Sequence, residues 1–245
     1  MKIAFAILAS ITASITASAA QAAPGLGEKV YGATIQPGEA ELEARYGRLT
    51  GGGDAGADAL VFEAAYGFSE RVYGAVLAEF QREPDGSRKL EAIAVEGIYA
   101  LGHIAPLDLD VALYGEFEAG VHGPDKVETK LLLEHEKGPF DGRLNLIAEK
   151  HLVGGTPLGL GYAASADWGV ADEFRLGGAA FGELGSTRGL TTRTEHFAGP
   201  IAKYAVEHLG KGELEIEAGY LFALGRARED TDGQVRLLLE YALKF

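Results

Sequence analysis

The chain has 245 residues, of which 47% are hydrophobic and none is cysteine, and its formal net charge is −14. This size and composition exclude a short disulfide-stapled scaffold, and the lack of cysteine excludes thiolate metal sites and thiol catalysis. An acidic surface repels phosphate backbones, so we expect no nucleic-acid partner.

The first predicted element is a leader. Lys2 supplies a positive charge, residues 3–20 form an apolar run, and Ala20-Gln21-Ala22 ends that run with small residues. This layout is typical of a secretory signal peptide, so we expect residues 1–22 to be removed on export. No later run of about 18 apolar residues exists, which excludes a membrane-spanning helix and leaves a soluble exported protein or a β-barrel.

The rest of the chain alternates apolar and polar side chains with a period of two. Within residues 107–118, for example, Leu113 and Phe117 share one face while Asp110 and Glu116 share the other. Such alternation is typical of strands with one apolar and one wet face. The predicted strands span 39–49, 58–68, 70–82, 88–100, 106–119, 126–137, 142–152, 157–168, 172–184, 193–207, 212–225 and 233–245.

These strands are joined by connections that mostly alternate between longer and tighter ones. The pattern predicts one all-β domain, a single antiparallel transmembrane β-barrel of about 12 strands over residues 39–245, with the tight turns in the periplasm. We expect residues 23–38 to form an N-terminal periplasmic segment and both chain termini to be periplasmic. Pro200 interrupts a predicted strand, and because proline lacks a ladder donor we expect a bulge or kink there.

The last strand carries the most specific local signal. Its apolar face comprises Val235, Leu237, Leu239, Tyr241, Leu243 and the terminal Phe245. This strand resembles the C-terminal assembly signal of Gram-negative outer-membrane β-barrel proteins of the porin-like kind, although no particular subfamily is recognised. The resemblance implies that Tyr241, Leu243 and Phe245 are read by the barrel-insertion machinery, that the last strand closes against the first, and that the barrel lies in outer-membrane lipid.

The inward parity of the predicted barrel holds two to three acids for each base, so complete pairing is impossible and some carboxylates are hydrated, protonated or bound to cations. The predicted lumen and selectivity residues are Glu63, Glu79, Glu96, Asp110, Glu116, Glu118, Glu134, Glu149, Arg45, Arg71, Arg143, Arg175 and Lys203. Acidic rings in a low-dielectric wall concentrate cations. We therefore expect a porin-like channel for passive diffusion of small, preferably cationic solutes. One alternative is that the acids merely keep the lumen wet. Another is a plugged barrel that acts as a structural or partner-binding outer-membrane protein.

A lipid-modifying enzyme is a weaker alternative. Twelve-stranded barrels resemble outer-membrane phospholipases, which use Ser, His and Asn on the lipid-facing side, but Asn145 is the only asparagine and its parity points inward. In Glu134-His135-Glu136 the acids and the histidine face opposite ways, so they cannot hold one ion. We expect no enzyme activity, no metal site and no cofactor.

Overall fold

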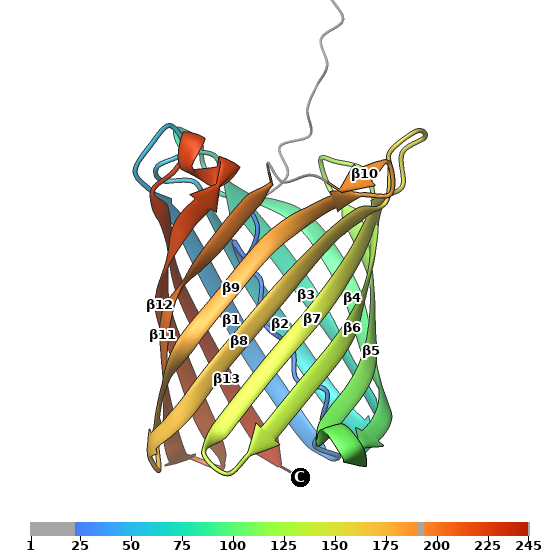
Figure 1. Cartoon of the computed structure of the whole chain (residues 1–245), viewed down its shortest axis with the longest axis vertical. Coiled ribbons are helices and arrows are strands. Elements are labelled where there is room, and N and C mark those ends of the chain that lie inside the picture. The colour runs from blue at the N-terminus through green and yellow to red at the C-terminus, as the bar shows by residue number, and fades with distance from the viewer. Residues whose placement is uncertain (1–22, 191–193, 245) are drawn as a thin grey trace, which may run out of the picture.

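The computed structural model describes residues 23–190 and 194–244, which form a closed antiparallel β-barrel (Figure 1). Its wall consists of β1 (Glu39–Thr50), β2 (Asp58–Ser69), β3 (Val72–Arg82), β4 (Lys89–Ile104), β5 (Leu109–Gly120), β6 (Lys126–Lys137), β7 (Phe140–His151), β8 (Gly159–Ala171), β9 (Phe174–Ser186), β11 (Glu195–Leu209), β12 (Gly212–Gly225) and β13 (Gly233–Lys244). The short β10 (Gly189–Leu190) pairs only with β9, and η1 (Ala105–Leu107) and η2 (Arg226–Glu229) are single 3-10 turns. The predicted fold class and strand number are confirmed.

The barrel closes between its first and last strands. β1 pairs with β13 from Glu39 opposite Lys244 to Thr50 opposite Gly233, and every other strand of the wall pairs with its neighbours along the chain. Closure leaves no strand edge with unpaired backbone groups. Among the described residues no helix is long and apolar enough to cross a bilayer.

The expected irregularity at Pro200 takes a milder form than a bulge. The β11–β12 ladder is interrupted between Ala198 and Ile201, and the register is the same on both sides of the gap. The register shift in this strand pair lies further on, between Val206 and Leu209. Leaving Pro200 out of the ladder on one side is enough to accommodate a residue without a backbone N–H.

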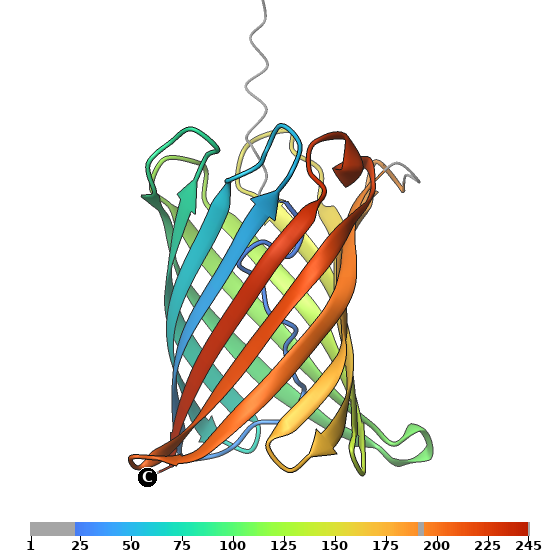
Figure 2. The ribbon, with the colours of Figure 1, turned by 90° about the vertical axis from the view of Figure 1, so that its left-hand side faces the viewer.

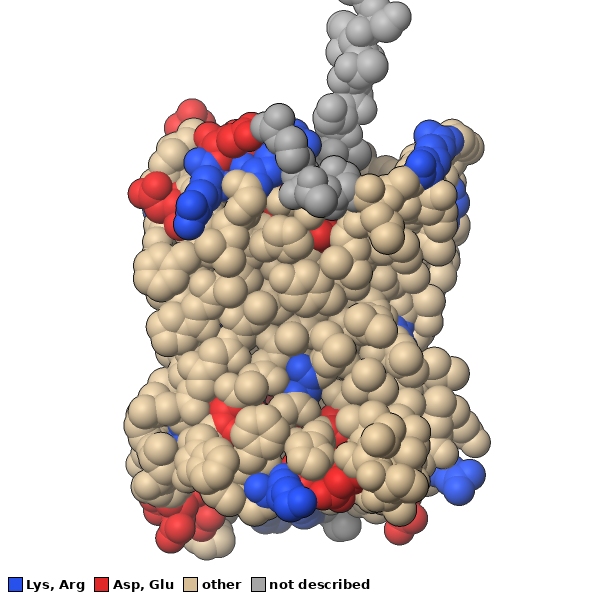
Figure 3. All heavy atoms as spheres, viewed as in Figure 1, with Lys and Arg blue, Asp and Glu red and all other residues tan. Residues whose placement is uncertain are grey.

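Side chains alternate between the inside and the outside of the wall. On β4, Ile93 and Val95 are 53% and 54% exposed, whereas Ala92 and Ala94 are buried. Figure 3 shows charged side chains gathered toward the two ends of the barrel and a largely uncharged band between them. The outer surface is therefore apolar where a bilayer would contact it.

The two ends of the barrel differ in their connections. One end, the loop end, carries the longer loops, including η2 (Figure 2). The opposite end, the turn end, carries the tight turns, η1 and the end of β13.

The segment before β1 differs most from expectation. Residues 23–38 lie inside the barrel, where they run from the loop end at Ala23 to the turn end, and there the Gly38 N–H donates to the Gly67 carbonyl at 2.8 Å (Figures 1 and 2). We expected a periplasmic segment and two periplasmic termini, but the described segment lies within the lumen, and Ala23 and the end of β13 lie at opposite ends of the barrel. Residues 1–22 lie outside the described residues, so the leader remains a prediction.

Candidate functional site

Residues 23–38, the N-terminal segment, are held in the lumen at several levels. Nearest the loop end, residues 23–27 form a turn against β9 and β13. The Gln234 side-chain amide donates to the Pro24 carbonyl at 2.9 Å, and the Arg236 guanidinium donates to the Glu28 carbonyl at 3.0 Å. Leu26 packs in the apolar cluster around Phe181 and is 7% exposed. The turn is thus fixed by both polar and apolar contacts.

Midway along the segment, Tyr31 is held on both its backbone and its ring. Its N–H donates to Asn145 Oδ1 at 2.8 Å, and Asn145 Nδ2 donates to the Tyr31 carbonyl at 2.9 Å. The Tyr31 hydroxyl donates to Glu96 at 2.8 Å, and its ring lies 4.8 Å from that of Tyr114. Asn145 therefore pairs with the segment in the way a strand backbone would, which satisfies two buried backbone groups.

A buried group of charges lies beside Tyr31. The Lys29 ammonium is 2.7 Å from Glu43 and 3.4 Å from Glu63, and Arg45 is 2.8 Å from Glu63 and 3.0 Å from Glu43. All four side chains are almost fully buried, so each charge depends on its partners. Lys29 thus contributes a positive charge to a group whose other members come from the wall.

Toward the turn end, Glu134 accepts three hydrogen bonds from the segment. The donors are the N–H of Ala33 at 2.8 Å, the N–H of Thr34 at 3.1 Å and the Thr34 hydroxyl at 3.0 Å. Arg143 lies 3.0 Å from the same carboxylate. A charged acceptor shared among these donors gives stronger hydrogen bonds than a neutral one.

The N-terminal segment divides the lumen into cavities of unequal size. The cavity at the loop end, called the outer cavity, has a volume of about 800 Å³, and the cavity at the turn end, called the inner cavity, has about 420 Å³. Between them a space of about 40 Å³ is bordered by Tyr31, Arg45, Tyr114, Glu116 and Lys130. This small space, called the constriction, is bordered by side chains of the segment and of the wall together.

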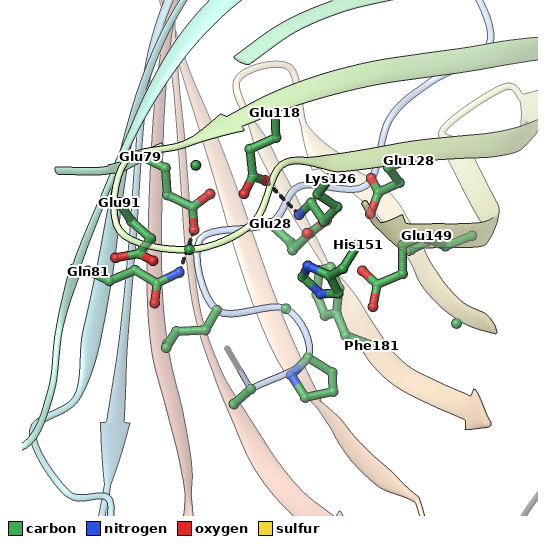
Figure 4. A pocket seen from close by; sticks show the side chains of 18 of the residues that line it. Glu28, Glu79, Gln81, Glu91, Glu118, Lys126, Glu128, Glu149, His151 and Phe181 are labelled. Carbon is green, nitrogen blue, oxygen red and sulfur yellow. Dashed lines mark hydrogen bonds and ion pairs between the residues drawn. The ribbon is translucent and has the colours of Figure 1, made fainter. Parts of the chain in front are cut away.

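Charge is unevenly distributed between the two larger cavities. Among the described residues that line the outer cavity there are eight acids and two lysines, namely Glu28, Glu79, Glu83, Glu91, Glu118, Glu128, Glu149 and Glu183 with Lys89 and Lys126 (Figure 4). The inner cavity is lined by eight acids and five bases, namely Glu39, Glu41, Glu134, Glu136, Asp141, Glu215, Glu217 and Glu240 with Lys29, Arg143, Arg175, Lys203 and Arg236. The local excess of acids is therefore twice as large at the loop end.

The residues predicted to line the lumen fall into distinct places. Glu79, Glu118 and Glu149 face the outer cavity, and Glu116 borders the constriction. Those that hold the N-terminal segment, directly or through one partner, are Glu63, Glu96, Glu134, Arg45 and Arg143. The sequence pattern assigns both groups to an open lumen. The residues that hold the N-terminal segment instead contact a part of the same chain.

Other predicted residues lie nearer the turn end. Arg175 and Lys203 both pair with Asp167 beside the inner cavity, Lys203 at 3.1 Å. Asp110 is 3.1 Å from His103 Nδ1.

Arg71 corrects the prediction, because it lies in the exposed turn between β2 and β3 and borders none of the three cavities. The reason is that β3 begins at Val72, two residues later than predicted.

The predicted assembly residues lie on β13. The Tyr241 hydroxyl donates to the Leu209 carbonyl at 2.7 Å, and Leu243 pairs with Ala40 of β1 and Gly212 of β12. Phe245 lies outside the described residues. Recognition by the insertion machinery therefore stays a prediction.

Sequence reasoning missed the residues of the N-terminal segment. Lys29 and Tyr31 stand in a stretch without strand or helix periodicity, so no pattern marks them as buried. The signal that is present is the surplus of inward acids, which calls for internal cations and donors. The parity of Asn145 correctly predicts an inward side chain, but its partner cannot be named from sequence.

Comparisons with known proteins identify the fold. No protein-family model matches the sequence, and no curated protein matches it. The COG4313 outer membrane channel from Pseudomonas putida F1 superposes with a TM-score of 0.61 at 12% identity, covering 92% of this chain and 100% of that one. The NanC porin gives 0.56 at 11% identity, covering 83% and 100%, and the KdgM porin gives 0.55 at 10%, covering 84% and 99%. The chain therefore has the barrel architecture of outer-membrane porins.

Proposed function

We propose that this protein is a porin-like channel of the Gram-negative outer membrane, through which small, preferably cationic solutes diffuse passively. The observation that carries the proposal is a closed barrel with an apolar outside and an outer cavity lined by eight acids and two lysines. Carboxylates in a low-dielectric wall raise the local concentration of cations and repel anions. Export by a cleaved leader and assembly by the insertion machinery belong to the same proposal.

The solutes that we propose for this channel carry the opposite charge to the ligand of one porin with a similar fold. A KdgM porin with a TM-score of 0.54 to this chain is known in complex with oligogalacturonate, an anionic saccharide. The carboxylates around the outer cavity would repel such a polyanion. We infer a preference for the opposite charge.

A plugged barrel is the second candidate, and a specific observation favours it. The constriction beside Tyr31 has a volume of only about 40 Å³, far smaller than the outer and inner cavities. If the N-terminal segment stays in place at all times and closes this space to ions, the barrel is structural or binds a partner. We propose the channel as the principal function because cavities of substantial volume lie on both sides.

Planar-bilayer recording of the refolded full chain separates these candidates. The channel proposal expects discrete openings with a cation-selective reversal potential in a KCl gradient. The variant Glu79→Gln plus Glu149→Gln removes two acids from the outer cavity and should lower the cation-to-anion permeability ratio. The control Glu70→Gln plus Glu173→Gln changes two exposed acids at the turn end by the same charge and should leave it unchanged.

A folded barrel that stays electrically silent would support the plugged candidate. Equal shifts of the reversal potential in both variants would mean that the outer cavity does not determine selectivity.

A further inference from the structure

The outer cavity joins two kinds of surface. Acids from five consecutive strands, β3 to β7, line one side, and Glu118, Glu128 and Glu149 are among them (Figure 4). Pro24 and Leu26 of the N-terminal segment also line the cavity, with Ile147 and Phe181 of the wall, and these four side chains are apolar. A volume of about 800 Å³ lies within the range of cavities that hold small organic molecules.

Some acids of the outer cavity take part in ion pairs within the described chain, and others do not. Lys126 pairs with Glu118 at 2.7 Å, but Glu79 accepts from the uncharged amide of Gln81 at 2.8 Å. Among the described residues, no ion pair joins Glu79 or Glu91 to a base. These two carboxylates are therefore free of a direct ion pair within the described chain and can attract a positive charge in the cavity.

His151 gives an independent sign of an unfilled polar position. Its ring lies at the edge of the outer cavity close to Glu149 in the view of Figure 4. Its Nδ1 atom is shielded from solvent and has no hydrogen-bond partner among the described residues. Buried polar atoms are ordinarily satisfied, so this unpartnered nitrogen marks a polar position at the cavity edge that the described chain leaves without a partner.

The cations of the chain itself show how this lumen holds positive charge. The Arg236 guanidinium lies 4.6 Å from the centre of the Phe181 ring, and the Lys29 and Lys130 ammonium groups each lie 4.8 Å from that of Tyr31. Each of these cations also contacts a carboxylate. Cation–aromatic contacts are more favourable where water is excluded. The outer cavity likewise combines carboxylates with apolar side chains, and it has room for a separate molecule.

We propose that the outer cavity is a binding site for organic cations in which an ammonium group is attached to an apolar body, such as an arylalkylammonium ion. This inference rests on the proposed function, since it names the class of solute that would collect above the constriction. The ammonium group lies toward Glu79 and Glu91, and the apolar body lies against Leu26 and Ile147. An inorganic cation gains only the charge interaction, and a neutral aromatic molecule gains only the apolar one.

Calorimetric titration of the refolded full chain in detergent tests the site with three probes. Phenethylammonium carries both features, methylammonium carries the charge alone, and 2-phenylethanol carries the apolar body alone. We expect phenethylammonium to bind about tenfold or more tightly than either control, because one charge contact and one buried ring each contribute on the order of a factor of ten. Titration into detergent alone corrects for partition into micelles.

Two variants locate the site. Glu79→Gln plus Glu91→Gln should weaken phenethylammonium binding about tenfold. The matched control Glu39→Gln plus Glu136→Gln removes two acids from outside the outer cavity and should leave the affinity unchanged. Equal binding of phenethylammonium and methylammonium, or equal loss in both variants, would overturn the inference. Conductance is recorded separately. A cation-selective channel that does not bind phenethylammonium contradicts the binding site alone. A barrel that binds phenethylammonium but stays electrically silent contradicts the channel alone.

Discussion

At the scale of single residues, Asn145 and Tyr31 determine where the N-terminal segment lies. The Asn145 side chain is fully buried and makes both a donor and an acceptor contact with the Tyr31 backbone. An amide suits this position because its oxygen accepts from the N–H while its NH₂ group donates to the carbonyl of the same residue.

The substitution Asn145→Leu is expected to release this part of the segment. It keeps the branched shape and the number of heavy side-chain atoms but leaves two buried backbone groups of Tyr31 unsatisfied, at a cost of about 2 to 4 kcal/mol in the free energy of unfolding. We expect a lower urea midpoint and a larger single-channel conductance. The control Ser165→Ala changes another inward-facing buried residue of the neighbouring strand and should alter neither. An unchanged conductance in the asparagine variant would show that Tyr31 does not limit the flow of ions.

Gly25 is expected to tolerate no side chain. Its φ is +82°, and a Cβ atom there would lie 2.5 Å from Cγ of Phe181. Gly25→Ala should therefore lower the free energy of unfolding by about 1 to 3 kcal/mol through overlap and backbone strain. Gly53→Ala, where no atom lies within 4 Å of the added Cβ, should change it by less than about 0.5 kcal/mol. Equal effects in urea titrations would contradict the close packing of the turn on Phe181.

The sequence predicts correctly which side chains face the inside of the barrel, but it does not predict their hydrogen-bond partners. Alternation placed Glu96 and Glu134 on the inside because the side chains of a strand alternate strictly. It could not show that the Tyr31 hydroxyl and the Ala33 N–H would be their partners. Those contacts depend on a non-periodic stretch that folds back into the barrel, and no local pattern encodes such a path.

At the scale of elements, the N-terminal segment is the part of the chain that lies inside the barrel and borders its cavities. Adjacent residues of the segment differ in environment, since Ala33 is 2% exposed and Thr34 is exposed beside the inner cavity. Because the chain has no cysteine, a single introduced thiol reports on its own position.

Single-cysteine labelling tests this placement. Thr34→Cys should react with a small hydrophilic thiol reagent at least about tenfold faster than Ala33→Cys, because reactivity follows access. The rates would be measured on the refolded barrel and again in denaturant, where the two sites should become equivalent. Equal rates in the folded state would place the segment outside the lumen, as expected from the sequence alone.

Strand boundaries were predicted to within a few residues except where the ladder is irregular. β4 continues to Ile104, beyond the predicted end at residue 100, and a register shift lies between Ala100 and Gly102. The break in alternation there was interpreted as a loop. A bulge and a loop both interrupt a period of two, so the sequence alone does not distinguish them.

At the scale of the whole molecule, the apolar outer band should lie in lipid. Trp168 is the only tryptophan, and its side chain lies on the outer surface with 53% exposure. In vesicles that contain brominated lipids, its fluorescence should be strongly quenched, since an aromatic residue at the edge of the band lies within reach of the acyl chains. Emission that is unquenched and matches that of the denatured chain would contradict membrane insertion. A barrel that fails to insert cannot be the proposed channel.

The central claim is that the barrel is a cation-preferring channel narrowed by its own N-terminal segment. The most direct test records single channels in a KCl gradient from the full chain and from a variant that lacks residues 24–36. We predict small cation-selective openings for the full chain and larger openings that remain cation-selective for the deletion, because the segment borders the constriction while most of the acids belong to the wall. Silence from both proteins, or anion selectivity in either, would contradict the account.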